Sequence, residues 1–354
     1  MQLGYRFSFL IGALCIIIGW MDQLIFGQVQ LPVFPINVIV FFVLVNILLI
    51  YFYGFRKSGL YKWMVSVPAS IGAVSSFSLL LIASGLYPQN EASGAFIDNI
   101  KNSWPFLLTG VYLILTLGLT TIRRSIPFKR ANIGFIFNHL GLWLVVTAGI
   151  LGRGDLQRLN LAVKENELSK IAYSNENIYE LPFGIYLKDF HIDFYPAKMG
   201  VVKNKDLSTE KILIFNNGKV QYADNKFSIK KKSGQGWLIE LDNKKIAEVS
   251  TNKPDFINLN DKVSLIFYPP GASLFKSDVL INDESFIVKV NQPVSFKGWK
   301  IYQNSYELHS DGDISIFEIV KDPWLPIIYS GLVMMILGAI YLLIKGNKKT
   351  KDAI

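Results

Sequence analysis

The sequence predicts an integral membrane α-helical bundle of six transmembrane helices with an inserted extracytoplasmic all-β domain, antiparallel and sandwich-like. Of the 354 residues, 51% are hydrophobic and the mean hydropathy is +0.32. A soluble protein of this length rarely has so apolar a composition, because its surface must be solvated. The apolar residues are concentrated in runs long enough to cross a bilayer, about 20 residues each. These runs are residues 7–27, 33–53, 63–87, 104–122, 133–152 and 323–344.

The domain between the fifth and sixth runs, residues 153–322, has the composition and length of a soluble unit with its own core. "FGIYLKDFHIDFYP" alternates apolar and polar residues with one slip around Asp189, which predicts a strand with a β-bulge. "EKILIFNNGKVQYA" has the Asn-Asn-Gly signal of a hairpin turn. Short strands at close spacing, without a long helical period, favour an antiparallel sandwich or a barrel-like domain.

The net charge of +9 predicts topology and gives no support to nucleic-acid binding. Residues 153–322 carry 23 Lys and Arg against 23 Asp and Glu, so this domain is neutral. The excess positive charge lies in short loops at alternate ends of consecutive runs and in the C-terminal tail. Because positive short loops face the cytoplasm, both termini are expected there and the β domain on the other side. The chain has one cysteine, Cys15, so it is not itself a thiol–disulfide exchanger.

His139 is the residue of the fifth run that calls for an explanation. If the helix starts near residue 133, the ring lies about 9 Å along the axis, roughly a third of the way across the hydrocarbon core. One interpretation is a neutral imidazole hydrogen-bonded to Thr116, Thr120 or a backbone carbonyl. The other is an axial ligand to haem iron, with Gly141 letting a flat macrocycle approach the helix. No other histidine lies in any run, so a second axial imidazole would have to come from another protein.

The segment "KIYQNSYE" and the tryptophan before it place several polar aromatic residues near the end of the β domain. They are Trp299, Tyr302 and Tyr306, with Gln303 between the two tyrosines. One interpretation is that they pack a sheet face against the membrane surface, which Tyr and Trp favour. The other is a contact surface for haem, a client chain or a partner.

Catalytic motifs are missing from the sequence. No GxSxG, HExxH, phosphate-binding or dinucleotide-binding signature is present, so we expect no catalytic residue and no metal site beyond haem iron. His191 is expected to be solvated, because it alternates with Phe190 and Ile192, and His309 is expected on a surface turn.

Five segments follow one another along the chain in a characteristic order: "VPASIGAVSSFSLLLIASGLYPQ", "SWPFLLTGVYLILTLGLTTIRR", "NHLGLWLVVTAGILG", "VNQPVSFKGWKIYQNSY" and "KDPWLPIIYSGLVMMILG". The second begins with Ser-Trp and ends with Arg-Arg, and the fourth has Asn-x-Pro followed by Gly and Tyr-Gln-x-Ser-Tyr. In this order the five segments resemble the ResB family, membrane subunits of the system II pathway of cytochrome c biogenesis. The resemblance covers roughly residues 63–345.

The family layout divides the chain into four parts. Residues 1–62 are two additional N-terminal helices that the family's four-span layout lacks, and residues 63–152 are the three helices of the ResB-like core. Residues 153–322 are the extracytoplasmic domain, and residues 323–354 are the final helix with its basic cytoplasmic tail. The resemblance implies a multi-pass protein of the bacterial cytoplasmic (inner) membrane.

The resemblance also implies a function. ResB-like proteins pair with a CcsA-like membrane partner, and together they export haem b and present it for covalent attachment to apocytochrome c. The family's intramembrane haem-ligating histidine corresponds to His139, with a partner histidine opposite. The cysteines of apocytochrome c must be reduced thiols, so a thiol reductant system is an implied neighbour. The chain lacks a tryptophan-rich haem segment and is expected to be a subunit of a haem lyase complex that is not catalytic alone.

Two alternatives stay open. In the first, the chain is a structural scaffold that docks apocytochrome and does not itself bind haem, and His139 only packs. In the second, it is a membrane sensor or transport accessory unrelated to haem.

Overall fold

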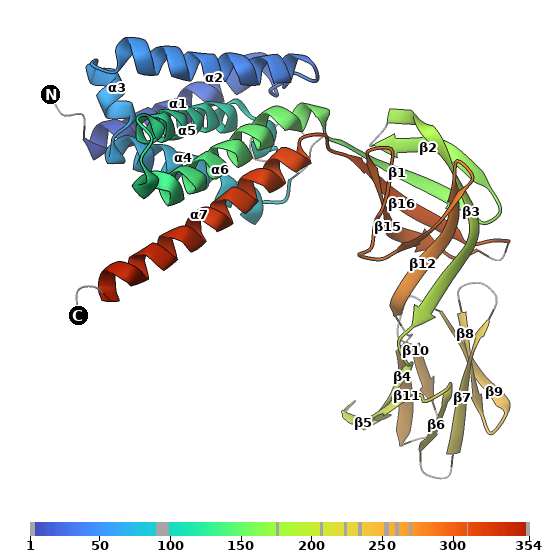
Figure 1. Cartoon of the computed structure of the whole chain (residues 1–354). Coiled ribbons are helices and arrows are strands. Elements are labelled where there is room, and N and C mark those ends of the chain that lie inside the picture. Colours follow the sequence, from blue (N-terminus) through green and yellow to red (C-terminus); the bar gives the residue numbers. More distant parts are fainter. Residues whose placement is uncertain are drawn as a thin grey trace. The chain divides into compact units, whose positions relative to one another are not determined.

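The structure is a computed structural model, and it divides the chain into two compact units (Figure 1). One unit is Met1–Leu156 together with Asp322–Ile354, and the other is Gln157–Lys321. The residues described are 4–89, 99–174, 177–205, 208–222, 225–232, 236–250, 255–258, 262–268, 271–309 and 311–351. Part of the loop between the third and fourth apolar runs, residues 90–98, therefore lies outside the described residues.

The first unit is a bundle of helices, and within the described residues six of them are long and apolar enough to cross a membrane. This confirms the six predicted runs and their approximate boundaries. A short helix, α3 (Gly59–Met64), joins the second and third long helices. The long helices are α1 (Tyr5–Phe26), α2 (Ile36–Phe55), α4 (Val67–Leu86), α5 (Trp104–Ser125), α6 (Ile133–Leu151) and α7 (Leu325–Lys351).

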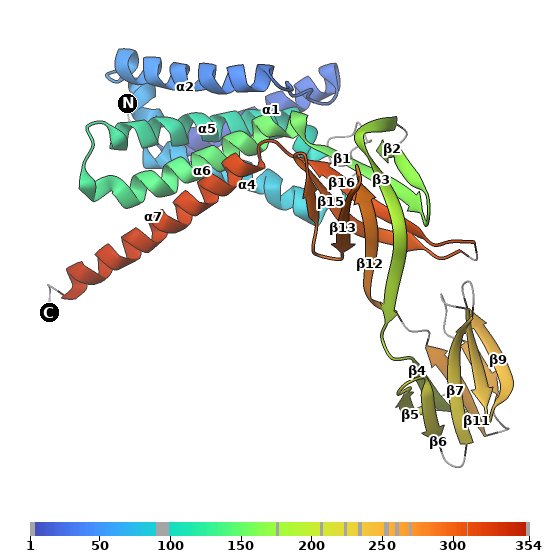
Figure 2. The same ribbon diagram turned by 45° about the vertical axis from the view of Figure 1, so that its right-hand side comes forward.

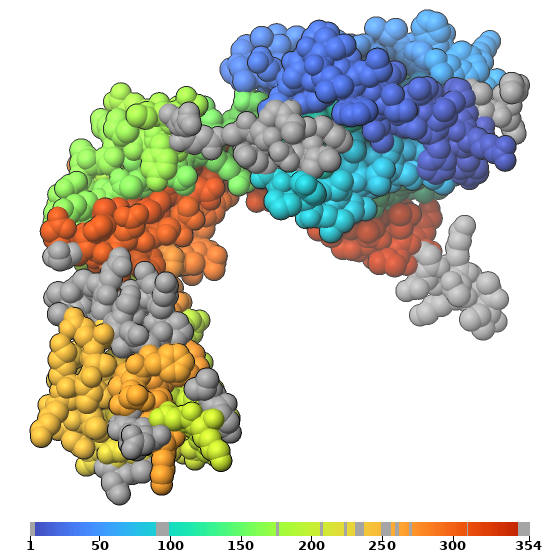
Figure 3. Space-filling model, turned by 180° about the vertical axis from the view of Figure 1, so that it is seen from behind, coloured from blue at the N-terminus to red at the C-terminus, as the bar shows by residue number. Residues whose placement is uncertain are grey.

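The two N-terminal helices are integral to this bundle. Helix α1 packs against α4 and α5, and the segments coloured blue and cyan lie side by side in Figure 3. A Cβ added to Gly19 would lie 2.5 Å from the backbone nitrogen of Pro105, and one added to Gly72 would lie 2.8 Å from the backbone of Ser8. The Ser8 hydroxyl accepts a hydrogen bond from the buried indole of Trp63 at 3.0 Å. These contacts need glycine, because any side chain would push the helices apart.

Asp155 joins three segments of the bundle. Its carboxylate accepts hydrogen bonds from the Phe34 backbone N–H at 2.7 Å, the Asn37 amide at 2.7 Å and the Trp324 indole at 2.8 Å. The Asn37 side chain is fully buried and also donates to the Leu151 carbonyl oxygen at 3.1 Å. The beginnings of α2 and α7 are thus fastened to the end of α6.

The second unit contains an eight-stranded antiparallel sheet with the order β13-β12-β3-β2-β1-β16-β15-β14. The sheet curls on itself, as the contacts of its two ends show: β13 at one end touches β14 and β15 at the other end. Its core is lined by residues that alternate along the strands, such as Leu161, Phe183, Ile185 and Phe317. The strands are β1 (Gln157–Lys164), β2 (Leu168–Ser174), β3 (Asn177–Phe194), β12 (Ala272–Ile281), β13 (Glu284–Lys289), β14 (Val294–Phe296), β15 (Trp299–Glu307) and β16 (Ile314–Lys321).

The predicted bulge near Asp189 is confirmed. Strands β3 and β12 lie side by side (Figure 2), and Asp189 pairs with Asp278 while Leu187 pairs with Val279. Lys188 is the extra residue, and the bulge keeps Leu187 and Phe190 buried on either side of it.

Residues between β3 and β12 form a second lobe of two four-stranded antiparallel sheets, with orders β10-β11-β4-β5 and β6-β7-β8-β9. Its core contains Met199, Phe227, Ile239 and Phe267. The predicted hairpin at residues 216–218 is confirmed, because Asn216 bridges to Lys219 around a turn with positive φ at its two central residues. The strands are β4 (Lys198–Lys203), β5 (Thr209–Ile214), β6 (Lys219–Tyr222), β7 (Asn225–Lys232), β8 (Gly236–Leu241), β9 (Lys244–Ser250), β10 (Asp255–Asn258) and β11 (Val263–Tyr268).

Candidate functional site: the His139 groove

His139 lies in the second turn of α6 and is half-buried. Its Nδ1 atom is 3.0 Å from the carbonyl oxygen of Phe135, one turn earlier. A carbonyl can only accept a hydrogen bond, so in the neutral ring Nδ1 carries the proton and Nε2 keeps its lone pair. A histidine held in this way by a backbone carbonyl is prepared to coordinate a metal through Nε2.

A stack of planar groups leads from this imidazole to a cation. The rings of Phe135 and His139 are stacked, with centroids 3.6 Å apart and planes inclined by 22°. On Phe135 lies the guanidinium of Arg124, whose Cζ atom is 4.8 Å from the ring centroid. The stack fixes the plane of the imidazole and holds the arginine against α6.

His139 is on the wall of a groove of about 740 Å³ formed by α4, α5 and α6. This volume is in the range of small-molecule and cofactor sites. The groove lies where α4 and α6 begin and α5 ends, so all three helices contribute the same end of the bundle. The side of the groove formed by α4 and the residues just before it has apolar side chains with serine hydroxyl groups between them. The residues that line the whole groove are Val65, Ser66, Val67, Ser70, Ile71, Val74, Ser75, Thr120, Arg123, Arg124, Phe135 and His139.

Gly141 does not face this groove, and the expectation that it lets a macrocycle approach is wrong. A Cβ at Gly141 would lie 2.5 Å from the carbonyl oxygen of Gly331 on α7. The glycine is used for close packing of α6 on α7, in a reciprocal contact in which Gly331 also approaches the Gly141 backbone. Asn138 is on this α7 side too, with its amide 3.5 Å from the Met335 carbonyl oxygen.

The three predicted hydrogen-bond partners for His139 can now be distinguished. A backbone carbonyl, that of Phe135, is the partner. The Thr116 hydroxyl donates to its own helix, with carbonyl oxygens of Tyr112 and Leu113 at 3.0 Å. The Thr120 hydroxyl is buried without a hydrogen-bond partner among the described residues and lines the same groove as His139.

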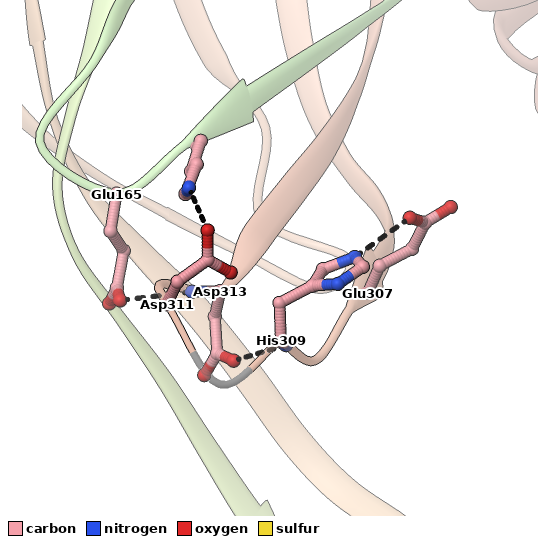
Figure 4. A network of polar contacts seen from close by, with 6 residues as sticks. Glu165, Glu307, His309, Asp311 and Asp313 are labelled. Atoms are coloured by element: carbon pink, nitrogen blue, oxygen red, sulfur yellow. Dashed lines mark hydrogen bonds and ion pairs between the residues drawn. The ribbon is translucent and has the colours of Figure 1, made fainter. Parts of the chain in front are cut away.

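The chain's other two histidines are in the β unit and are exposed, as predicted for both. His309 belongs to a polar network at the turn before β16 (Figure 4), where its Nε2 atom is 3.3 Å from Glu307 and its backbone N–H donates to Asp313. Glu165 accepts from the backbone N–H of Asp313 in the same network. Among the described residues, no three His, Cys, Asp or Glu side chains gather as a metal site.

The network includes an ion pair that changes the acidity of its members. The Lys164 ammonium is 2.6 Å from the Asp311 carboxylate. This hydrogen bond holds the pKa of Asp311 below its ordinary value and raises the pKa of Lys164. The pair joins the end of β1 to the turn before β16 at the surface, where such a pair contributes little to stability.

Two of the four residues expected to form a contact surface, Trp299 and Gln303, are buried within the large sheet. Trp299 is 6% exposed and packs edge-on against Phe183 in the core of the large sheet. Gln303 is also 6% exposed, because its side chain points into the sheet's interior. Tyr302 and Tyr306 are half-buried, and Tyr306 packs against the core rings of Phe190 and Phe275.

Gln303 belongs to a buried hydrogen-bond triad that the sequence analysis missed. The Ser277 hydroxyl donates to Gln303 Oε1 at 2.6 Å, Gln303 Nε2 donates to the Ser315 hydroxyl at 2.8 Å, and the two serine hydroxyls are 2.8 Å apart. The three residues come from β12, β15 and β16. A serine at an inward position of a strand was the available signal, but only the sheet order brings the three together.

In comparisons with known proteins, no family model and no curated protein sequence matches this chain.

Proposed function

We propose that this chain holds haem b in its membrane bundle through His139 and, with a CcsA-like partner, exports it for covalent attachment to apocytochrome c. The single observation that carries the proposal is the state of His139, whose Nδ1 is bound to the Phe135 carbonyl and whose ring borders a groove of cofactor size. That arrangement leaves Nε2 to coordinate iron.

The groove suits a flat amphiphile that comes from the cytoplasm. Its polar end carries Arg123 and Arg124, and the positive-inside rule assigns that end to the cytoplasmic face. Haem would enter there, take His139 as one axial ligand and an imidazole of the partner as the other, and then pass to the partner's outer site. The membrane in this proposal is the bacterial cytoplasmic membrane, with the β unit on its outer side.

Attachment itself is assigned to the complex and not to this chain alone. Each cysteine S–H of apocytochrome adds across a vinyl C=C of haem, which forms a C–S bond and a C–H bond with no net oxidation. The cysteines must be thiols at that step, so a thiol reductant system supplies them in reduced form.

One observation favours the scaffold alternative, in which His139 only packs. The ring is already satisfied at Nδ1 by a backbone carbonyl and is stacked on Phe135, and many polar residues in membrane helices are satisfied in this way. The two functions differ in what a glutamine at this position does: a scaffold keeps cytochrome c maturation near normal in His139→Gln.

The test is co-expression of the chain with its CcsA-like partner, followed by purification of the complex in lipid nanodiscs. Haem content and the axial-ligand absorption spectrum are compared for the wild type, His139→Ala and the control His309→Ala, which changes an exposed histidine. We expect His139→Ala to lose the bis-imidazole spectrum and most of the haem, and added imidazole to restore the spectrum by occupying the vacated position. Undiminished haem in His139→Ala removes this role from the residue.

A further inference from the structure

The polar end of the His139 groove carries two arginines for which the described part of the chain provides no acidic partner. Arg123 and Arg124 both line the groove, and no carboxylate lies within ion-pair distance of either among the described residues. No Asp or Glu is among the groove's lining residues. Arginines at the end of a membrane helix commonly extend to the interface, where lipid and water solvate them.

These two arginines are instead held against the groove by their surroundings. Arg124 lies over the Phe135 ring at 4.8 Å, on the α6 wall. Arg123 donates through Nη1 to the carbonyl oxygen of Val65 at 3.4 Å, just before the first turn of α4. The two guanidiniums are thereby placed on opposite walls, one on α6 and one at α4.

The first turn of α4 adds to the positive potential. Helix α4 begins at Val67, and Val65, Ser66 and Val67 line the groove. The N-terminus of a 20-residue helix carries a partial positive charge and favours an anion. The groove thus has an imidazole and an apolar wall along its length, and two guanidiniums with a helix N-terminus at its end.

We infer that Arg123 and Arg124 bind the two propionate carboxylates of haem, and so set the orientation in which the macrocycle enters the groove. The inference rests on the proposed function and deepens it by naming the chemistry of the second recognition point. A planar guanidinium matches a carboxylate with two parallel N–H···O bonds. Two of them together select a ligand with two acidic groups at one edge and an apolar body.

The experiment separates the role of the arginines from that of the histidine by using two probes, each of which lacks one part of haem. Metal-free protoporphyrin IX has both carboxylates and no iron, while haem dimethyl ester has iron and no free carboxylate. Both probes are titrated into the purified complex in phosphatidylcholine nanodiscs. The variants are Arg123→Gln/Arg124→Gln, His139→Ala, and a control of equal charge change, Lys129→Gln/Arg130→Gln, in a loop outside the groove. Thermal unfolding checks that each variant is folded.

We expect the double arginine variant to bind protoporphyrin IX at least about tenfold more weakly and haem dimethyl ester as the wild type does, and the control to change neither. His139→Ala should bind haem dimethyl ester more weakly than the wild type does and should bind protoporphyrin IX as the wild type does. Unchanged protoporphyrin IX binding in the double arginine variant overturns the inference, as does an equal loss in the control. If phosphatidylglycerol binds through the arginines while porphyrin binding ignores them, they are lipid contacts and the inference is also wrong. Intact haem dimethyl ester binding in His139→Ala contradicts the proposed function alone.

Discussion

The Nδ1 atom of His139 lies 3.0 Å from the carbonyl oxygen of Phe135, and the side-chain rings of the same two residues are stacked. One residue thus fixes both the proton position and the plane of the imidazole. His139 also lines the groove, together with Phe135.

Replacing Phe135 with leucine should weaken haem binding without abolishing it. The backbone carbonyl remains, so Nδ1 keeps its partner, but the stack that orients the ring is lost. Aromatic pairs contribute about 0.5–1.5 kcal/mol, which corresponds to a roughly two- to tenfold loss of affinity. Haem titration of the complex measures it, and Phe137→Leu on the exposed side of α6 is the control. A loss as large as that of His139→Ala would mean that Phe135 acts on more than the orientation of the ring.

Gly141→Ala should destabilise the bundle. The added Cβ would lie 2.5 Å from the Gly331 carbonyl oxygen, so α6 and α7 must separate. Gly149→Ala on the same helix has open space around its Cβ and should be tolerated. Thermal unfolding of the detergent-solubilised protein compares the two, and equal melting temperatures would contradict the close α6–α7 packing.

Asp155→Ala should loosen the N-terminal hairpin from α6 and α7. The variant removes the acceptor of the Trp324 indole and of one Asn37 amide bond, and a buried donor left unpaired costs about 1–3 kcal/mol. Asp193→Ala, at an exposed position of β3, serves as the control. Limited proteolysis of the loop around Phe34 should become faster in Asp155→Ala only.

Gln303→Leu should destabilise the large sheet by about 1–3 kcal/mol, because the Ser277 and Ser315 hydroxyls then lose partners inside an apolar core. Asn304→Leu makes the same amide-to-leucine change at the exposed neighbouring position and is the control. Chemical unfolding followed by tryptophan fluorescence reports the difference, since Trp299 is buried in the same core. If the two variants unfold alike, the triad contributes nothing to stability.

Lys164→Met should make the β unit less stable at neutral pH and leave it unchanged in acid. The Lys164 hydrogen bond lowers the pKa of Asp311 in the folded protein, so the stabilisation is present above the ordinary aspartate pKa of about 3.9 and is lost as the pH falls through the folded value. The Asp311 side chain is exposed and that of Lys164 partly exposed, which keeps the effect small. Melting temperatures of wild type and variant should therefore converge at low pH, and a constant difference would exclude this pair as the cause.

The local features of this protein could be predicted from its sequence because they depend on residues close together in the chain. The helices are runs of apolar residues, and the hairpin at Asn216 and the bulge near Asp189 are encoded within a few residues. The relation of Phe135 to His139 is likewise a one-turn spacing on a helix.

The features that sequence reasoning missed depend on which elements become neighbours. A glycine on a helix allows close approach of either a ligand or another helix. The sequence alone could not decide between these two roles for Gly141, because it does not show that α7 packs there. Gln303 and Ser305 are separated by a register shift in the pairing of β15 with β16, and such a shift changes which side chains face inward. The α4 wall of the groove comes from a helix whose sequence carries no charged residue to mark it.

Strands β3 and β12 already form a ladder with each other, and Phe194 pairs with Ala272 where the chain leaves the large sheet and returns to it. The second lobe, formed by the residues between these two positions, is therefore a module that is joined to the large sheet at one place. Evolution can lengthen, shorten or exchange such a module while the parent sheet keeps its hydrogen bonds, and a protein engineer can excise it by closing the two strands with a tight turn.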